Sequence, residues 1–207
     1  MKKFKTKQEE FWSTKFGDEY TTRNKGSKII AGNIAVFAKI FEHMHSISSL
    51  IEFGAGSGNN LRAIQNLLPD IVMTAVEINQ TAVKDLKKIK NITIHNQSIL
   101  EYKPKKTYDL ALIKGVLIHI NPQALKHVYE LLYKTSKKYV CIMEYYNPTP
   151  IEVDYHRHKG YLFKRDFAGE MLYRFMDLTL VDYGFQYHRD NNFPLDDITW
   201  FLLEKKS

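Results

Sequence analysis

The chain has almost no cysteine, no long apolar run and no low-complexity segment. Cys141 is the single cysteine among 207 residues, which excludes a disulfide framework and a zinc site built from cysteines. The longest apolar stretch, residues 110–120, is interrupted by Lys114 and is shorter than the ~20 residues of a membrane helix. The basic start MKKFKTKQEE lacks the apolar core of a signal peptide. These absences predict a soluble, cytoplasmic protein without a membrane partner.

What is present is typical of one globular domain. Hydrophobic residues make up 44% of the chain and charged residues 26%, so the sequence can bury a core. We expect a single domain over residues 1–207, with an N-terminal lid or appendage at 1–26 and a substrate-side insertion at 147–176. Within the appendage, residues 16–26 are expected to form a polar loop. The formal net charge of +7 favours an anionic ligand, for which a small molecule suffices.

The order of predicted elements indicates an α/β fold. Strands are expected at 49–53, 71–77, 92–95, 108–114 and 138–146, alternating with helices at 61–68, 81–89 and 122–133. A helix that Ser27 could cap, running to about Met44, precedes them, and another covers 166–175. Residues 180–188 and 197–205 are joined by too short a loop for a helical crossover and should pair as an antiparallel hairpin. The prediction is a doubly wound, Rossmann-like, seven-stranded sheet, mostly parallel with an antiparallel C-terminal hairpin.

A glycine-rich turn follows the first strand of the predicted sheet. EFGAGSGNN places Gly54, Gly56 and Gly58 between a strand and a helix, where open α/β sheets bind nucleotide-like ligands. Glu77 ends the next strand, and a carboxylate there can accept both hydroxyls of a ribose. Asn59 stands where a dinucleotide motif has its third glycine, and no Gly-Lys-Ser/Thr follows, which argues against NAD and against a Walker loop.

This turn, with Glu52 two residues before Gly54, resembles motif I of class I S-adenosylmethionine-dependent methyltransferases. The resemblance implies S-adenosyl-L-methionine as the cofactor and a turn that wraps its methionine part. It also places Ser98 and Ile99 at the adenine, the terminal hairpin at the antiparallel seventh strand, and Asp109 at the start of the fourth strand. The residues expected to bind or hold the cofactor are Glu52, Gly54, Gly56, Gly58, Glu77, Ile78, Ser98, Ile99 and Lys114.

A finer resemblance covers nearly the whole chain. The segments that carry it are EFWSTKFGDEYTTRN (10–24), KGVLIHINP (114–122), EYYNPTP (144–150), HKGYLFKRDFAGEML (158–172) and VDYGFQYHRDNNFPLDDITWFLLEK (181–205). They are similar to bacterial methyltransferases described as pseudaminic acid biosynthesis-associated methylases. The resemblance implies a role in surface-glycan, flagellin-sugar or capsule modification.

Two residues are candidates for the chemistry. Methyl transfer to oxygen or nitrogen is an in-line displacement that needs alignment and the removal of at most one proton. His119 follows the fourth strand and could be a general base titrating near neutral pH, or it could pack at the start of a helix. Glu144 ends the fifth strand and could bind an amine, or it could simply end a strand beside exposed aromatic residues. The two readings of each residue stay open at this stage.

The acceptor is expected beyond the carboxyl ends of the fourth and fifth strands. Tyr145 and Tyr146 follow the fifth strand, and Arg157 and Lys159 lie in a basic connection that could bind an anionic group. Tyr20 and Arg23 belong to the N-terminal lid. No metal site is predicted, because the histidines near 156 lack a neighbouring acidic pair.

Two rival functions remain. The positive charge also fits an RNA or protein methyltransferase, although the basic residues are scattered and no nucleic-acid-binding module is attached. A catalytically silent, cofactor-binding partner subunit is the other alternative. The sequence favours a methyltransferase that acts on a small polar, anionic metabolite.

Overall fold

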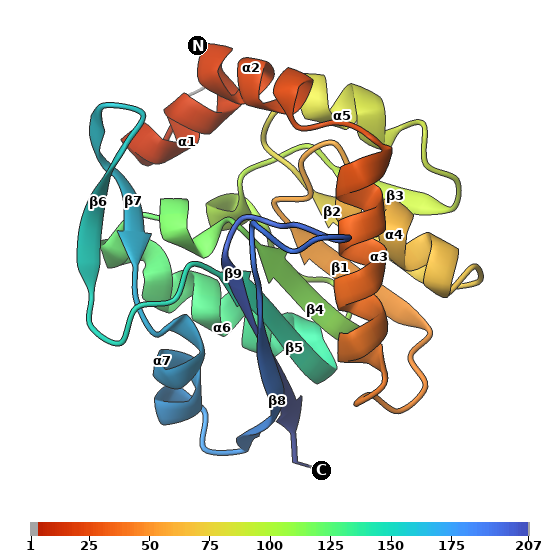
Figure 1. The fold of residues 1–207 in the computed structure, drawn as a ribbon. Coiled ribbons are helices and arrows are strands. Elements are labelled where there is room, and N and C mark those ends of the chain that lie inside the picture. The colour runs from red at the N-terminus through yellow and green to blue at the C-terminus, as the bar shows by residue number, and fades with distance from the viewer. Residues whose placement is uncertain (1–3, 207) are drawn as a thin grey trace.

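A seven-stranded sheet forms the centre of the computed structural model, which describes residues 4–206 (Figure 1). Its strand order is β3-β2-β1-β4-β5-β9-β8. The first five are parallel to one another, whereas β9 is antiparallel to both β5 and β8. The predicted α/β class, the seven strands and the C-terminal hairpin are therefore confirmed. The strands are β1 (Ser49–Phe53), β2 (Val72–Val76), β3 (Ile92–His95), β4 (Tyr108–Lys114), β5 (Ser136–Glu144), β8 (Leu178–Gln186) and β9 (Ile198–Lys205).

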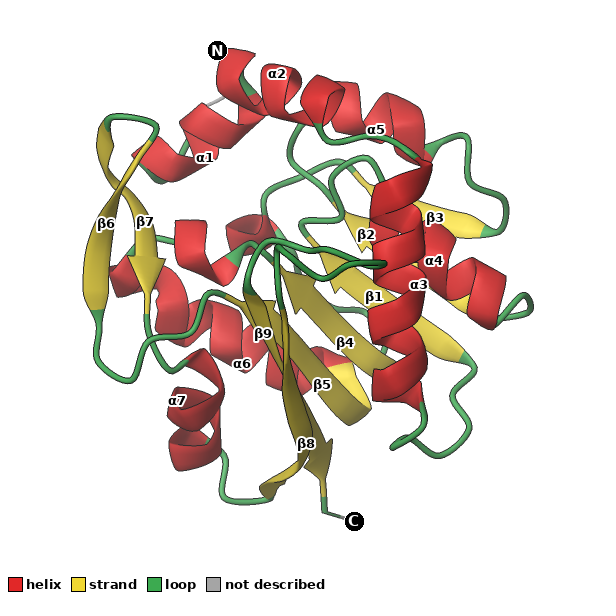
Figure 2. Cartoon of the chain, viewed as in Figure 1, coloured by secondary structure: helices red, strands yellow, loops and turns green. Residues whose placement is uncertain are grey.

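Helices cover both faces of this sheet (Figure 2). One buried cluster includes Val36, Ile64 and Leu86 from the helices before and between the early strands, and the other includes Val128 and Met171 from later helices. The helices are α3 (Ser27–Phe41), α4 (Asn59–Leu67), α5 (Gln80–Leu86), α6 (Leu125–Thr135) and α7 (Phe167–Arg174), with short 3-10 turns η1 (Ile99–Glu101), η2 (Leu117–His119) and η3 (Pro122–Ala124). Apolar residues at helical spacing and alternating residues along β1 together build the two cores.

The strand order places a crevice above the middle of the sheet. β1 lies between β2 and β4, so the chain leaves β1 in one direction for β2 and later returns to the other side for β4. At such a switch point the loops after the two neighbouring strands diverge and leave a crevice at the carboxyl edge. The turn after β1 and the residues after β2 and β4 thus meet at one place.

Two segments differ from the sequence-based expectation. Residues 16–26, expected as a polar loop, lie mostly in a helix, α2 (Lys15–Arg23), which follows α1 (Lys7–Ser13). The basic connection after β5 contains a hairpin of β6 (Ile151–Tyr155) and β7 (His158–Lys164). Each lies against a neighbouring segment: the α1 residue Gln8 donates to the carbonyl of Gly160 in β7 at 2.8 Å, and Asn79 donates to Asp18 of α2 at 3.0 Å. Such tertiary contacts override weak local patterning.

The start of α3 also differs in detail. Ser27 is the first helical residue, and the cap position is taken by Gly26 with φ 138°. A backbone conformation in this range is easily adopted only by glycine. No helix among residues 4–206 is long and apolar enough to cross a membrane.

Candidate cofactor and acceptor site

A cavity of about 690 Å³ lies at the carboxyl edge of the sheet. Its floor consists of residues after β1, β2, β3 and β4, and its cover consists of α1, α2, the β6–β7 turn and the loop before β9. The floor residues include Gly54–Ser57, Val76–Asn79, Ser98–Leu100 and Lys114–Val116. Most of the predicted cofactor residues are therefore brought together here.

Three glycines shape the turn after β1, each in a left-handed conformation. Gly54, Gly56 and Gly58 have φ of 72°, 53° and 82°. A Cβ at Gly54 would lie 2.5 Å from a methyl of Val116, and one at Gly58 would lie 2.5 Å from Ile89. A Cβ at Gly56 would meet nothing within 4 Å, so this position opens onto the cavity. Gly56 is the place where a ligand can approach the backbone closely.

Glu77 lies directly after β2 and faces the same turn. Its Oε2 accepts the backbone N–H of Gly56 at 2.7 Å, and its Oε1 accepts that of Asn79 at 2.7 Å. Burial raises the pKa of this carboxyl, and the three backbone N–H groups that it accepts, including that of Ile78, oppose the shift. A carboxylate oxygen has two lone pairs, so Glu77 keeps the capacity to accept hydroxyl groups from a ligand in the cavity.

A chain of polar side chains lies at another part of the floor. The buried Lys114 Nζ donates to Asn33 Oδ1 at 2.8 Å and to Asn60 Oδ1 at 3.2 Å. Asn60 Nδ2 in turn donates to Glu52 Oε1 at 2.6 Å. Burial raises the pKa of Glu52 to about 8 and lowers that of Lys114, although the two groups attract each other.

This network of polar side chains leaves one hydrogen-bond donor without a partner at the cavity. The Nδ2 of Asn33 has no hydrogen-bond partner among the described residues, and Asn33 lines the cavity beside Lys114. Glu52 itself does not line the cavity. Its role here is to orient Asn60 and, through it, Lys114, which corrects the expectation of a direct cofactor contact. Gly58 also does not line the cavity, because it packs against Ile89 and Leu86. The expectation that it contacts the cofactor directly is corrected as well.

The N-terminal helices are latched to the rim of the cavity by hydrogen bonds. Asn79 Nδ2 donates to the carbonyl of Trp12 at 3.1 Å and to Asp18 Oδ1 at 3.0 Å. Hydrogen bonds from Thr81 and Asn79 lower the pKa of Asp18. Gly17 lies against this latch, where an added Cβ would overlap the Trp12 carbonyl.

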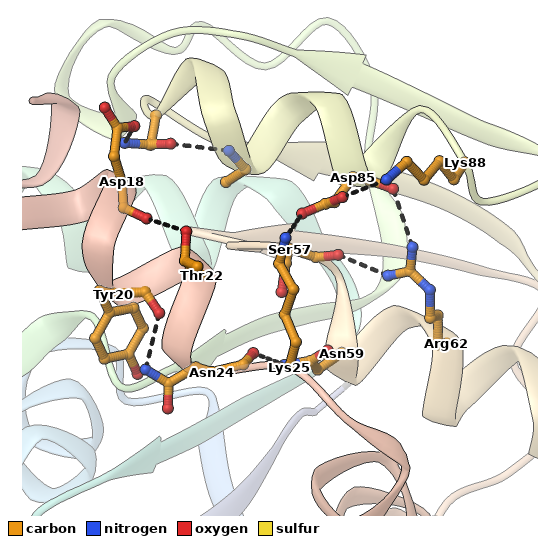
Figure 3. A network of polar contacts seen from close by, with 12 residues as sticks. Asp18, Tyr20, Thr22, Asn24, Lys25, Ser57, Asn59, Arg62, Asp85 and Lys88 are labelled. Atoms are coloured by element: carbon orange, nitrogen blue, oxygen red, sulfur yellow. Dashed lines mark hydrogen bonds and ion pairs between the residues drawn. The ribbon is translucent and has the colours of Figure 1, made fainter. Parts of the chain in front are cut away.

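The end of α2 is tied to the glycine turn and to α5 (Figure 3). The Asn59 side chain donates to the carbonyl of Asn24 at 2.8 Å, and Lys25 pairs with Asp85 at 2.5 Å. Burial raises the pKa of Asp85, but its hydrogen bonds with Lys25 and Lys88 outweigh that effect and lower it. The covering segment is thus joined to the floor at two separate points.

Aromatic rings from the cover, together with His119 after β4 and Tyr145 after β5, form a second compartment of the cavity. The ring of Trp12 lies 4.7 Å from that of His119 and 5.1 Å from that of Tyr20, measured between centroids. Tyr155 lies 4.8 Å from His119, and Tyr145 also lines this part. We call Trp12, Tyr20, His119, Tyr145 and Tyr155 the aromatic chamber. Arg23 and Asp196 are the charged residues that line the cavity on the same side.

His119 has a fixed tautomer in this chamber. Its Nδ1 lies 2.6 Å from the carbonyl oxygen of Tyr161. Because a carbonyl only accepts, Nδ1 carries the proton and Nε2 keeps its lone pair. Burial lowers the pKa of His119 to about 4. The expected titration near neutral pH is therefore wrong, and the imidazole is neutral at pH 7.

Glu144 lies outside the cavity lining. Its Oε1 accepts the backbone N–H groups of Val116 at 2.9 Å and Leu117 at 2.8 Å. Burial raises its pKa to about 7, against the effect of these backbone donors. The structure thus corrects the prediction that Glu144 binds an amine. It holds the loop after β4, which carries Val116 and His119 into the cavity.

Three predicted acceptor residues also lie outside the lining. Tyr146 is 43% exposed and contacts Phe201 rather than the cavity. Arg157 is exposed in the turn between β6 and β7, and Lys159 is exposed at the start of β7. Of this basic run, His156 is the residue that reaches the cavity. The tight hairpin, with φ of 67° at Arg157, directs the run away from it.

The cavity lining includes the other predicted residues and several that sequence reasoning missed. The predicted ones are Gly54, Gly56, Glu77, Ile78, Ser98, Ile99, Lys114, His119, Tyr20, Arg23 and Tyr145. The missed ones include Gln8, Glu9, Asn33, Tyr155 and Asp196. They come from segments that are distant in sequence, and no local motif marks them. Within residues 4–206, no group of three or more histidine, cysteine or acidic side chains is placed to hold a metal ion.

Comparison with known proteins gives a family match for the part of the chain that surrounds the floor. Residues 51–136 match a family model described as a methyltransferase domain. The search of curated proteins finds no match to the chain.

Solved structures of methyltransferases are similar in fold. The 1,6-didemethyltoxoflavin-N1-methyltransferase of Burkholderia thailandensis, solved with S-adenosylhomocysteine, is 16% identical with a TM-score of 0.69, over 97% of this chain and 87% of that one. An S-adenosylmethionine-dependent methyltransferase of Clostridium acetobutylicum is 12% identical with a TM-score of 0.63, over 93% and 98%. The magnesium protoporphyrin IX methyltransferase of Synechocystis is 11% identical with a TM-score of 0.66, over 96% and 97%. At these identities the likeness establishes the shared fold.

Proposed function

We propose that this chain, a methyltransferase dependent on S-adenosylmethionine, transfers the methyl group to an oxygen or nitrogen of a small polar metabolite. The methyltransferase domain at 51–136 and the shared fold carry the first part. The single observation that supports a small polar metabolite as the acceptor is the two-compartment cavity, in which a polar floor adjoins an aromatic chamber.

The floor fits the cofactor. The open space at Gly56 admits a ligand against the backbone, and Glu77 offers carboxylate oxygens for two ribose hydroxyls. The free Nδ2 of Asn33 and the ammonium of Lys114 offer donors for the carboxylate of the methionine part. When bound, the sulfonium supplies an electrophilic methyl group. The chain's own residues hold it at the boundary with the aromatic chamber.

The aromatic chamber fits an acceptor that is small and polar. Rings of Trp12 and Tyr155 offer apolar faces, while Arg23 offers a cation for an anionic group of the acceptor. The lone pair on His119 Nε2 can accept a hydrogen bond from the acceptor's N–H or O–H and so orient the attacking atom. We infer that alignment in a water-poor chamber provides most of the rate, because a pKa of about 4 makes His119 a weak base.

Within this function we propose a role in bacterial surface-glycan or capsule biosynthesis. The support is the resemblance of five segments to pseudaminic acid biosynthesis-associated methylases, and it includes chamber residues Trp12, Tyr20, His119 and Tyr145. A sugar intermediate presents both hydroxyl groups and apolar ring faces, which suits the mixture of rings and polar groups in the chamber. We also propose that residues 1–26 act as a lid and that 147–176 form the acceptor-side insertion.

Incubation with methyl-labelled S-adenosylmethionine and, in parallel, with the small-molecule, RNA and protein fractions of bacterial cytosol tests the proposal. We expect label in a small polar compound and none with a Gly56→Arg variant as the matched control. Label in RNA or in protein instead would refute the small-molecule acceptor. Binding of the cofactor without any transfer would favour a silent partner subunit.

A further inference from the structure

We propose that Glu9, on the covering helix α1, completes the base-binding end of the cofactor site and selects adenine by its exocyclic amine. The assignment rests on the proposed function, because it concerns the same cofactor. It gives the N-terminal segment a direct part in cofactor recognition in addition to covering the acceptor.

The position of the base follows from the position of the ribose. Glu77 lies at the end of β2, and the glycine turn lies to one side of it, after β1. With the ribose on Glu77 and the methionine part along the turn, the base points the other way, toward the end of β3. The cavity residues at that end are Ser98, Ile99 and Leu100.

Glu9 lies against this same end of the cavity. It lines the cavity, is 9% exposed, and its Oε1 accepts a hydrogen bond from the hydroxyl of Ser98. Its Oε2 accepts the backbone N–H groups of Lys5 at 2.6 Å and Thr6 at 2.9 Å. Oε2 is therefore used by the chain, whereas Oε1 has one partner and a second lone pair for a ligand.

A second acceptor lies next to Glu9 on the same helix. Gln8 is 3% exposed and lines the cavity, and its Nε2 donates to the Gly160 carbonyl at 2.8 Å. Its Oε1 has no hydrogen-bond partner among residues 4–206. A buried oxygen without a donor is unfavourable by itself, so a ligand that brings an N–H would satisfy it.

The groups that α1 presents at this end are therefore hydrogen-bond acceptors. The hydroxyl proton of Ser98 is directed to Glu9, so it does not offset them. An exocyclic amine, as in adenine, offers two N–H donors to such a surface, whereas a 6-oxo base places an acceptor at that position and has its donor on N1 instead. The chemistry of the lining thus selects an amino base over an oxo base.

Calorimetric titration with two ligands tests this assignment. The ligands are S-adenosylhomocysteine and its 6-oxo analogue, in which hypoxanthine replaces adenine. For the wild type we expect the 6-oxo analogue to bind about 10-fold or more weakly, the effect of losing a hydrogen bond to a charged group. In Glu9→Gln this discrimination should fall to about threefold or less, because an amide cannot serve the Lys5 and Thr6 N–H groups and also accept from the ligand on its other atom.

Glu10→Gln is the matched control. Glu10 is the exposed neighbour on α1, so its substitution makes the same change of charge without reaching the cavity. Glutamine at position 9 preserves the helix cap, and thermal melting of the unliganded variants checks that α1 stays docked. We expect Glu10→Gln to match the wild type with both ligands.

Two results would overturn the assignment alone. One is that Glu9→Gln discriminates between S-adenosylhomocysteine and its 6-oxo analogue as strongly as the wild type does. The other is an equal loss of affinity for both ligands, which would mean that Glu9 merely holds the helix. Failure of the wild type to bind S-adenosylhomocysteine at all would instead overturn the proposed function, and this assignment with it.

Discussion

The floor and the cover of the cavity are built on different principles. The floor consists of strand ends and a glycine turn, so backbone geometry fixes its shape: Gly54, Gly56 and Gly58 all have positive φ. The cover consists of side chains from α1, α2 and the β6–β7 hairpin that pack on one another, such as Trp12 on Tyr20 and Phe11 on Tyr161. The shape of the floor therefore depends on the backbone, whereas the shape of the cover depends on the packing of its side chains.

Hydrogen bonds join the floor to the cover. Polar contacts from Asn79 and Asn59 on the floor reach the backbone carbonyls of Trp12 and Asn24 on the cover. Because they bind main-chain atoms, they tolerate changes in the cover's side chains. These two contacts hold the cover on the floor through its main chain. Asn79 also binds the side chain of Asp18, so the joint depends in part on residue identity.

The largest effect on ligand binding is expected from a substitution in the floor. Gly56→Arg should abolish binding of S-adenosylhomocysteine, because the side chain would enter the cavity that Gly56 leaves open. Gly56→Ala provides the graded control, since its Cβ meets nothing within 4 Å and adds only the strain of a positive φ, about 1 to 2 kcal/mol. Calorimetry on both folded variants distinguishes them. Full affinity in the arginine variant would place the cofactor elsewhere.

A substitution in the cover should reduce turnover of the acceptor much more than it reduces affinity for the cofactor product. Trp12→Ala removes the ring that contacts His119 and Tyr20, and we expect kcat/KM for the labelled acceptor to fall about 30-fold, or about 2 kcal/mol. Affinity for S-adenosylhomocysteine should change by about threefold or less.

Phe11→Ala is the control for the chamber. Phe11 stacks on Phe16 at 4.0 Å on the same helix pair and does not line the cavity. It should loosen the helix while leaving acceptor kinetics within about threefold. Equal losses in the two variants would show that the cover acts only as a lid.

The sequence indicated the floor far better than the cover. The turn at 54–58 and Glu77 could be found because a strand, a glycine pattern and a terminal carboxylate lie close together in one chain segment. Asn33, Tyr155 and Asp196 could not, because each belongs to a separate element and tertiary packing alone brings them to the cavity. Glu144 was misjudged for a related reason: its position at the end of β5 was correct, but backbone donors of the β4 loop occupy it.

The buried His119, which follows β4, should make stability depend on pH. The pKa of His119 is about 4 in the folded state and about 6.5 when unfolded, so the unfolded chain binds the extra proton between these values. Its contribution is therefore present above pH 6.5 and is lost as the pH falls toward 4, by up to about 3 kcal/mol. Urea unfolding of wild type and His119→Asn at pH 7 and pH 5 measures this. A stability difference between the two that stays constant with pH would contradict it.

The smallest effect concerns the latch between the two regions. Asn79→Ser keeps an oxygen to cap α5 but loses the amide donors to Trp12 and Asp18. We expect amide exchange in residues 12–24 to speed up by the equivalent of about 1 kcal/mol, with the sheet unaffected. Asn66→Ser, at an exposed asparagine of α4, serves as the control. Unchanged exchange in α2 would mean that the latch does not hold the cover.

The most direct test of the two-compartment account is a crystal structure of the protein with S-adenosylhomocysteine. The account predicts the ribose hydroxyls on Glu77, the amino acid end beside Asn33 and Lys114, and the sulfur facing the aromatic chamber of Trp12, His119 and Tyr155. A ligand whose ribose lies away from Glu77, or whose sulfur faces away from that chamber, would contradict it.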